Sequence, residues 1–432
     1  MSEILDEERL IEQILRAGTK SAADVEVFLS EGHSVNAELK RDLIGEAGES
    51  RSWGLGIRVI SEGRIGASST NDPARWKDCL QAALDAGKLA TPQEWGGLPE
   101  KADVSRKLAT FDPSLEVDVH VAHDLLREML VGAEEHPADI VGGSAGLSTG
   151  SLTLANSNGV MYSREGTGVG ISLETISGTS TGYEFGSSCF MDLDPVDVGR
   201  KAAFYAVHSV GGKEIADGTY DLVLSPVAVA ELLGNVFVPA LSGRNVGAGR
   251  SFLADRIGEE CMPPGVSLYD DPFHGQRSTN WDSEGVLTRR LDFVQDGILK
   301  CFAYDLRTAY RYGTKSTGSA VRGGPGGAPS IGMHNLYLDG PRSETGEEPA
   351  LYAHDLVGAH TANPVTGDFS VELSNASWIE GGNPGEPVRS AMLSGNVFSM
   401  LREISALGPE SRSLGSMVLP SVRFNSQQII GK

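Results

Sequence analysis

The segments Trp53-Gly-Leu-Gly-Ile-Arg-Val-Ile60 and Arg64-Ile-Gly-Ala-Ser68 decide the fold of the first half of this chain. They flank the dipeptide Glu62–Gly63, and two short apolar runs around such a pair indicate a β-hairpin. We therefore expect antiparallel hairpins here rather than a parallel sheet. Upstream, alternating apolar residues predict two more strands with a turn between them at Glu31–Gly32; these residues are Val25, Val27 and Leu29, then Val35, Ala37 and Leu39.

Helical patterns surround these strands. Helices are expected over about 72–90, 117–135 and 194–211, and the first and third of them open with Asp-Pro, which suits an N-cap followed by the first helical residue. Between the second and third, residues 151–190 alternate like strands, with a turn at Asn158–Gly159. We place a domain boundary after Gly212.

The second half is poorer in helical patterns. A strand is expected over 220–224, and Ser225-Pro226 then caps a helix through Leu233. Short apolar pieces follow, interrupted by Gly, Pro, Asp and Asn, and a last helical stretch is expected over about 396–407. The prediction is an α+β fold. Residues 1–212 form an N-terminal mixed α/β domain with an antiparallel sheet, and residues 213–432 form a C-terminal β-rich, curled-sheet or barrel-like domain.

Composition excludes several classes of function. The formal net charge of −22 opposes binding to nucleic acid, because phosphate repels carboxylate and no basic stripe compensates. No apolar run is long enough to span a bilayer, and the first 18 residues lack the features of a signal peptide. The four cysteines are widely spaced and form no CxxC pair, so we expect a reducing, cytoplasmic location.

Two local patterns suggest chemistry but have simpler interpretations. Ser180 lies in Gly178-Thr-Ser-Thr-Gly182, which fits G-x-S-x-G, but its flanks are strand-like on both sides. A nucleophile elbow needs a strand–turn–helix context, so a polar turn is favoured. His120, His123 and Asp124 have helical spacing and could share one cation, yet a solvated helix face explains them as well.

Two sets in the β-rich half remain as alternatives. His334, His354 and His360 could converge on a metal, although their spacing matches no motif, and ordinary loop histidines are favoured. The acids of Asp270-Asp271-Pro272 and Asp282-Ser-Glu284-Gly285 could perform acid–base chemistry or hold a hard cation. They could equally form Asx turns and caps, which is the favoured interpretation.

The informative segment is Ser225-Pro-Val-Ala-Val-Ala-Glu-Leu-Leu-Gly-Asn235. A zinc-protease helix needs two histidines on one face and a glutamate that polarises the bound water. Glu231 is present, but Ala230 has no donor atom and Asn235 offers only an amide. From these residues alone, a capped amphipathic helix is a sufficient explanation.

A set of motifs, in order along nearly the whole chain, indicates a family. They are Gly54-Leu-Gly-Ile-Arg-Val59, Asn156-Ser-Asn-Gly159, Leu224-Ser-Pro226, Leu241-Ser-Gly-Arg-Asn245, Gly249-Arg-Ser251, Asp270-Asp-Pro272, Asp282-Ser-Glu-Gly285, Asp296-Gly-Ile-Leu-Lys300, Lys315-Ser-Thr-Gly318, Thr366-Gly-Asp-Phe-Ser370 and Leu419-Pro-Ser-Val422. No single motif is specific, but the ordered set resembles the TldD/PmbA family, whose members are also called modulators of DNA gyrase.

The resemblance implies a role in proteolysis. The TldD branch is similar to zinc peptidases and carries H-E-x-x-x-H, which falls here on Ala230, Glu231 and Asn235. Both histidine positions are substituted here. The TldD branch also has a further zinc ligand near its C-terminal end, and no cysteine follows Cys301 to supply such a ligand. The chain is therefore assigned to the PmbA branch, also called TldE, with no catalytic residue, metal or cofactor of its own.

This assignment implies specific partners. We expect a TldD-type metallopeptidase subunit that carries the zinc, peptide substrates, and a homodimer when the partner is absent. One alternative is an autonomous hydrolase that uses His334, His354 and His360 or the acids at 270–284. A second alternative is a protein-binding modulator without a proteolytic role.

Overall fold

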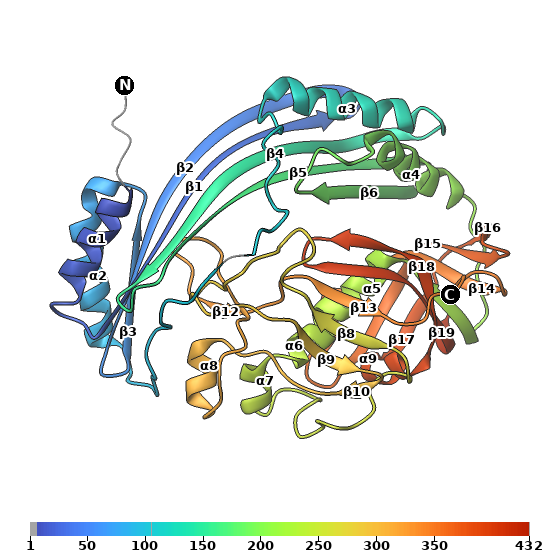
Figure 1. The fold of residues 1–432 in the computed structure, drawn as a ribbon. Helices are drawn as coiled ribbons and strands as arrows, with labels where there is room; N and C mark the ends of the chain where they lie inside the picture. Colours follow the sequence, from blue (N-terminus) through green and yellow to red (C-terminus); the bar gives the residue numbers. More distant parts are fainter. Residues whose placement is uncertain (1–6, 105, 432) are drawn as a thin grey trace.

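A long antiparallel sheet forms the first half of the chain. The computed structural model describes residues 7–104 and 106–431. The sheet order is β3-β2-β1-β4-β5-β6, and Figure 1 shows its long strands curving over the second half of the chain. The strands are β1 (Asp24–Lys40), β2 (Leu43–Ser61), β3 (Arg64–Thr70), β4 (Asp139–Asn156), β5 (Met161–Ser177) and β6 (Ser180–Ser188). The hairpin around Glu62–Gly63 joins β2 to β3 and is confirmed.

The turn expected at Glu31–Gly32 is wrong. Strand β1 continues through Gly32, which pairs with Ser52 on one side and Gly150 on the other, and the chain reverses only after Lys40. The apolar residues before and after Gly32 occupy positions of the same parity. They therefore face the same side of one uninterrupted strand, so the alternating pattern continues through Gly32 without a turn.

Helices cover the convex face of this sheet (Figure 1). They are α1 (Glu7–Gly18), η1 (Pro73–Arg75), α2 (Trp76–Leu89), α3 (Val119–Ala133) and α4 (Pro195–His208). The first pair, α1 and α2, packs at one end around Ile14 and Val27, whereas α3 and α4 pack at the other end around Leu126 and Leu147. The helices predicted over about 72–90, 117–135 and 194–211 are confirmed, with Asp72 capping the short turn η1 that leads into α2 and Asp194 capping α4.

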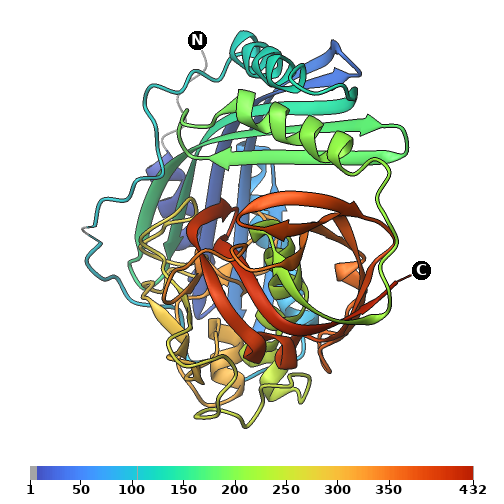
Figure 2. The ribbon, with the colours of Figure 1, turned by 90° about the vertical axis from the view of Figure 1, so that its right-hand side faces the viewer.

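A closed barrel forms the second half. Strands β19-β17-β15-β14-β7 are neighbours in that order, and β7 also pairs with β19, which closes the ring. Figure 2 shows these strands curling around one another. The barrel strands are β7 (Gly218–Leu224), β14 (Ala350–Val357), β15 (Asp368–Glu380), β17 (Met392–Asn396) and β19 (Met417–Ile430). The predicted α+β fold with a barrel-like C-terminal part is confirmed.

Short elements connect and extend the barrel. The helical ones are α5 (Pro226–Leu232), η2 (Leu233–Phe237), α6 (Val238–Ala240), α7 (Gly243–Gly247), α8 (Leu306–Arg311), η3 (Ala359–Thr361), α9 (Val397–Met400) and η4 (Leu401–Glu403). The strands are β8 (Ser267–Asp270), β9 (Leu291–Gln295), β10 (Ile298–Leu299), β11 (Ala320–Val321), β12 (Ser330–Ile331), β13 (Leu336–Asp339), β16 (Asn383–Val388) and β18 (Ile404–Leu414). Within residues 7–104 and 106–431, no helix has the length and apolar character needed to cross a membrane.

The helix expected over about 396–407 is too long. Helical structure ends at Glu403, and Ile404 begins strand β18. Ile404 and Leu407 are buried in the barrel core, and Ile404 pairs with Phe424 of β19. Pairing with a distant strand therefore overrides the local helical pattern.

A buried ion-pair cluster joins the two halves. Arg58 of β2 lies 2.6 Å from Glu26 of β1 and 2.8 Å from Glu284 of the C-terminal half. Arg322 lies 2.5 Å from the other oxygen of Glu26. Just beyond it, the loop over 322–329 packs on the sheet, where the backbone of Pro325 approaches Gly56 so closely that a side chain there would clash. The concave face of the sheet is thereby fixed over the loops of the second half.

Candidate functional site

Helix α5 carries the substituted motif, and its start follows from local sequence. The Ser225 hydroxyl oxygen accepts hydrogen bonds from the N–H groups of Val227 and Ala228, and it donates to the carbonyl of His354 at 2.5 Å. Pro226 occupies the first helical position, where a missing N–H has no consequence. The predicted cap is confirmed, and it ties the helix to strand β14.

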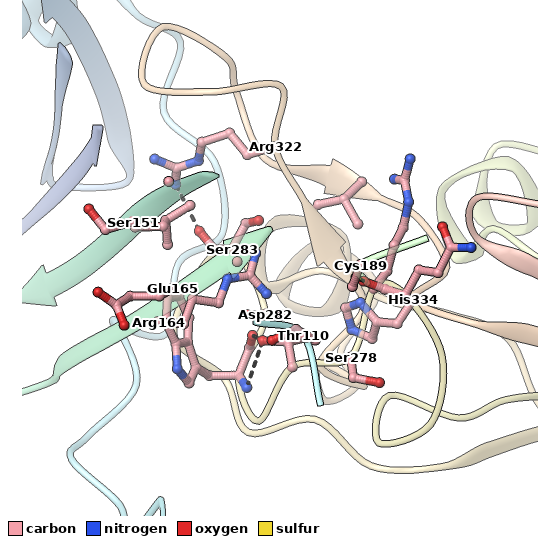
Figure 3. Close-up of a pocket in the computed structure, with 18 of the residues that line it drawn as sticks. Thr110, Ser151, Arg164, Glu165, Cys189, Ser278, Asp282, Ser283, Arg322 and His334 are labelled. Carbon is pink, nitrogen blue, oxygen red and sulfur yellow. Dashed lines mark hydrogen bonds between the residues drawn. The ribbon is translucent and has the colours of Figure 1, made fainter. Parts of the chain in front are cut away.

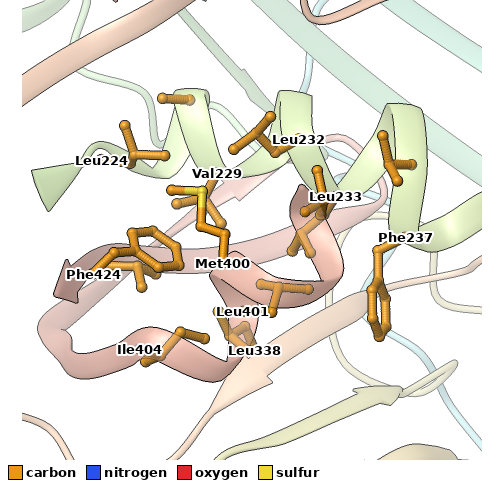
Figure 4. Close-up of a cluster of buried hydrophobic side chains, with 14 of the residues drawn as sticks. Leu224, Val229, Leu232, Leu233, Phe237, Leu338, Met400, Leu401, Ile404 and Phe424 are labelled. Carbon is orange, nitrogen blue, oxygen red and sulfur yellow. The ribbon is translucent and has the colours of Figure 1, made fainter. Parts of the chain in front are cut away.

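An apolar face anchors the same helix in the barrel. Val229, Leu232 and Leu233 belong to one buried cluster with Met400 and Leu401, and Figure 4 shows Val229 and Leu233 on the side of the helix that faces them. All five side chains are buried. The motif helix is therefore held rigidly, and its polar residues Glu231 and Asn235 keep fixed positions.

The helix widens into a π-turn at the motif. Residues Leu233–Phe237 form this turn, in which the N–H of Val238 bonds to the carbonyl of Leu233. Such turns are rare and frequently occur at functional sites. Asn235 lies within it, and its side-chain amide donates to the carbonyl of Glu231 at 2.8 Å. The nitrogen of that amide is therefore already engaged by the helix itself.

Glu231 belongs to a carboxyl pair rather than a histidine cluster. Its side chain is half-buried, and one carboxyl oxygen has no hydrogen-bond partner among the described residues. Burial raises the pKa of Glu231 to about 8, and the neighbouring negative charge of Asp355 contributes to the increase. Asp355 lies on β14 and accepts the N–H of Leu356 at 2.8 Å. At neutral pH the Glu231 carboxyl is therefore largely protonated.

These side chains do not fit a catalytic zinc ion. Zinc in peptidases is held mainly by histidine nitrogens, with carboxylates or thiolates completing the set. Ala230 offers no donor, and the neighbouring pair is Glu231 with Asp355. In the part of the chain that the structure describes, no group of three or more His, Cys, Asp or Glu side chains could hold a metal ion.

The three histidines considered as an alternative lie in different surroundings. His354 is buried, stacks on Tyr205 with ring centroids 3.8 Å apart, and its Nε2 lies 3.8 Å from Glu184. Burial lowers the pKa of His354. The Nε2 atom of His334 lies 2.9 Å from the carbonyl of Gly318, and His360 is exposed on η3.

The acids at 270–284 accept backbone hydrogen bonds. Asp270 accepts the N–H groups of His334 and Asn335, and Asp282 accepts those of three residues, namely Glu284, Val286 and Ala320. Glu284 pairs with Arg58 and accepts the N–H of Leu306. Each carboxylate therefore fixes a loop.

The two remaining candidates, at Ser180 and on helix α3, also have structural roles. Ser180 begins β6 directly after the turn that follows Ser177, so strands flank it on both sides. On α3, Asp124 pairs with Arg127 at 2.6 Å.

A cavity that the sequence did not reveal lies between the sheet and the second half (Figure 3). It has a volume of about 400 Å³. Strands β4 and β5 contribute Ser151, Arg164 and Glu165, and the loops of the second half contribute Trp281, Asp282 and Arg277, among others. We call it the sheet–loop cavity. Arg164 lies in the strand sequence Tyr162-Ser-Arg-Glu-Gly166, and no local pattern there indicates that it faces loops more than a hundred residues away.

Three family models match the chain. They describe PmbA/TldA metallopeptidase domain 1 over residues 25–89, the central domain over 112–210 and the C-terminal domain over 217–431. An uncharacterised protein of Methanocaldococcus jannaschii is 28% identical over 97% of this chain and 99% of its own. Metalloprotease PmbA of Escherichia coli O157:H7 is 26% identical over 96% of this chain and 94% of its own. The crystal structure of TldE from Thermococcus kodakarensis superposes with a TM-score of 0.91 at 27% identity, covering 98% of this chain and all of that one.

Proposed function

We propose, from the premise that this chain belongs to the PmbA/TldD metallopeptidase family, that it is the non-catalytic, TldE-type subunit of a peptidase complex. In this proposal a TldD-type partner carries the zinc and cleaves the peptide bond, and the complex degrades or processes peptides in the cytoplasm. This chain completes the peptide-binding chamber and binds no zinc or other cofactor. When the partner is absent it forms a homodimer, since two-fold assemblies are the commonest oligomers.

One observation carries the proposal. The helix position at which the active branch of the family has H-E-x-x-x-H carries Ala230, Glu231 and Asn235 here. Ala230 has no donor, the Asn235 amide bonds to its own helix, and Glu231 is paired with Asp355. Without histidine ligands beside it, Glu231 has no zinc-bound water to polarise.

Similarity to named proteins supports the same role. The superposed Thermococcus protein is named TldE, and its structure and this one agree over almost their full lengths. The Escherichia coli relative is named a metalloprotease. The shared fold and the metalloprotease name of this relative support a role in proteolysis, and the motif of this chain lacks both histidines.

The experiment distinguishes the activity and zinc content of this chain from those of its partner. Purified chain, a purified TldD-type subunit with intact H-E-x-x-x-H, and their mixture are assayed on an unfolded peptide, with zinc content measured for each. We expect no cleavage and no stoichiometric zinc for this chain alone, and chelator-sensitive cleavage by the mixture. Cleavage by this chain alone at the rate of the mixture, together with one zinc per chain, would overturn the proposal. Size-exclusion chromatography with light scattering then reports whether the two chains form one complex.

A further inference from the structure

Strand β5 forms part of the wall of the sheet–loop cavity, and the alternation of its side chains decides which of them face the cavity. Tyr162 packs against Trp281 of the second half, with ring centroids 5.7 Å apart, so the face that carries Tyr162 is directed at the loops. Arg164 is two residues further along and shares that face, and its guanidinium lies 5.3 Å from the Trp281 ring. Glu165 is on the opposite face, and Figure 3 shows its carboxylate pointing away from the middle of the cavity.

A second acid of this wall also faces outward. Glu31 is opposite Ser151, and Ser151 is opposite Glu165 across the next pair of strands, so the three share one face of the sheet. The charge of Glu31 contributes to raising the pKa of Glu7 in α1, which places its carboxylate on the helix-covered side. Neither Glu31 nor Glu165 is therefore positioned to neutralise Arg164.

The other ionisable side chains that line the cavity already have partners. Arg322 pairs with Glu26 and donates to the carbonyl of Ser283 at 3.0 Å. Asp282 accepts three backbone N–H groups, and the His334 ring contacts the Gly318 carbonyl. These groups hold the loops in place, and among the described residues none of them pairs with Arg164 or Arg277.

Within the part of the chain that the structure describes, Arg164 and Arg277 have no acidic partner. Among the described residues neither guanidinium forms an ion pair or a side-chain hydrogen bond. Both residues line the cavity and are exposed to solvent, yet the surrounding protein desolvates Arg164 enough to lower its pKa. In a chain with a formal net charge of −22, two unpaired arginines in one cavity are a local excess of positive charge that favours an anionic ligand.

We propose that the sheet–loop cavity binds the carboxylate of an extended peptide through the guanidinium of Arg164, with Arg277 adding positive charge. The ligand class rests on the proposed function in peptide processing. A guanidinium presents parallel N–H groups that match a carboxylate, and the Trp281 ring contacts the guanidinium of Arg164. The volume of about 400 Å³ is within the range of small-ligand sites.

The experiment measures binding to the isolated full-length chain by fluorescence anisotropy. Three fluorescein-labelled probes are used: tetra-alanine with a free C-terminal carboxylate, the same peptide with a C-terminal amide, and an amidated peptide with one internal glutamate. The variants are Arg164→Ala, Arg164→Lys and Arg277→Ala. Arg250→Ala is the matched control, because Arg250 is exposed and does not line the cavity.

We expect the free-acid peptide to bind wild type at least about ten-fold more tightly than its amide, as for a charge-assisted hydrogen-bonded pair. Arg164→Ala removes this preference, Arg164→Lys keeps part of it, and Arg250→Ala leaves it unchanged. Binding of the amidated glutamate peptide would identify a side-chain carboxylate as a second source of the same ligand group. The Lys and Arg277 variants preserve the test if Arg164→Ala folds poorly.

The proposal is wrong if the acid and the amide bind equally, or if Arg164→Ala behaves like Arg250→Ala. It is also wrong if inorganic phosphate binds the cavity more tightly than the free-acid peptide. Because no partner subunit is present, these results are independent of the cleavage assay. If the mixture with the partner cleaves peptide but the isolated chain shows no preference for the free carboxylate, only this site is refuted. If the isolated chain binds the carboxylate but forms no complex with the partner, only the proposed function is refuted.

Discussion

Replacing Glu231 by glutamine should stabilise the chain at alkaline pH and have little effect at acidic pH. Burial beside Asp355 raises the pKa of Glu231 from 4.5 to about 8. Between these two pH values the folded state holds a proton that the unfolded state has released, so the glutamate lowers stability as pH rises through this window. A glutamine cannot ionise, and Glu231→Gln therefore escapes this loss.

The magnitude follows from the pKa difference. A change from 4.5 to about 8 corresponds to at most about 5 kcal/mol in the free energy of unfolding. Glu231 is only half-buried, and solvent screening reduces this to about 2 kcal/mol above pH 8. With about 2 cal/mol/K of unfolding entropy per residue, that difference raises Tm by about 2 °C for cooperative unfolding of the whole chain, and by about 4 °C if one half unfolds alone.

The assay is differential scanning calorimetry of wild type and Glu231→Gln at pH 5, 7 and 9. The exposed Glu410 supplies the control substitution Glu410→Gln, which should change Tm equally at all three values. The gain for Glu231→Gln should be near zero at pH 5 and largest at pH 9. A gain that is independent of pH, or a lower Tm at pH 9, would refute the reasoning about the carboxyl pair.

Three further substitutions test the contacts that hold the two halves, the helices of the sheet and the motif helix in place. Arg58→Ala leaves Glu26 and Glu284 buried without their shared cation, so we expect a loss of about 3 to 5 kcal/mol, measured by thermal unfolding. Gly199→Ala should destabilise the contact of α4 with α3 by at least about 2 kcal/mol in the same measurement, since its Cβ would meet a backbone carbonyl oxygen at 1.8 Å. Ser225→Ala removes the cap of the motif helix and should cost about 1 kcal/mol in urea-induced unfolding.

Matched controls sharpen these predictions. Arg51→Ala removes an exposed arginine whose ion pair with Glu49 is largely solvated, so its effect should stay below about 1 kcal/mol. Gly170→Ala adds a Cβ that meets no atom within 4 Å, and it should leave stability nearly unchanged. If either control destabilises as much as its buried counterpart, the assigned contacts are not the cause.

Local sequence was sufficient where the determining contacts are themselves local. The hairpin at Glu62–Gly63 and the cap at Ser225-Pro226 depend on backbone preferences of adjacent residues, and both are confirmed. The substitution of both histidine positions, at Ala230 and Asn235, is likewise visible in the sequence, because the presence or absence of a donor atom is a property of the residue alone.

Tertiary structure decided everything that depends on distant neighbours. Pairing with β19 turns Ile404 into a strand residue, and a distant strand places Asp355 beside Glu231 and raises its pKa. The position of Arg164 over Trp281 likewise arises only when the sheet folds over the loops of the second half. Burial, pKa and the charge of a cavity are sums over groups brought together by folding, so the sequence determined which donor atoms exist and the fold determined what surrounds them.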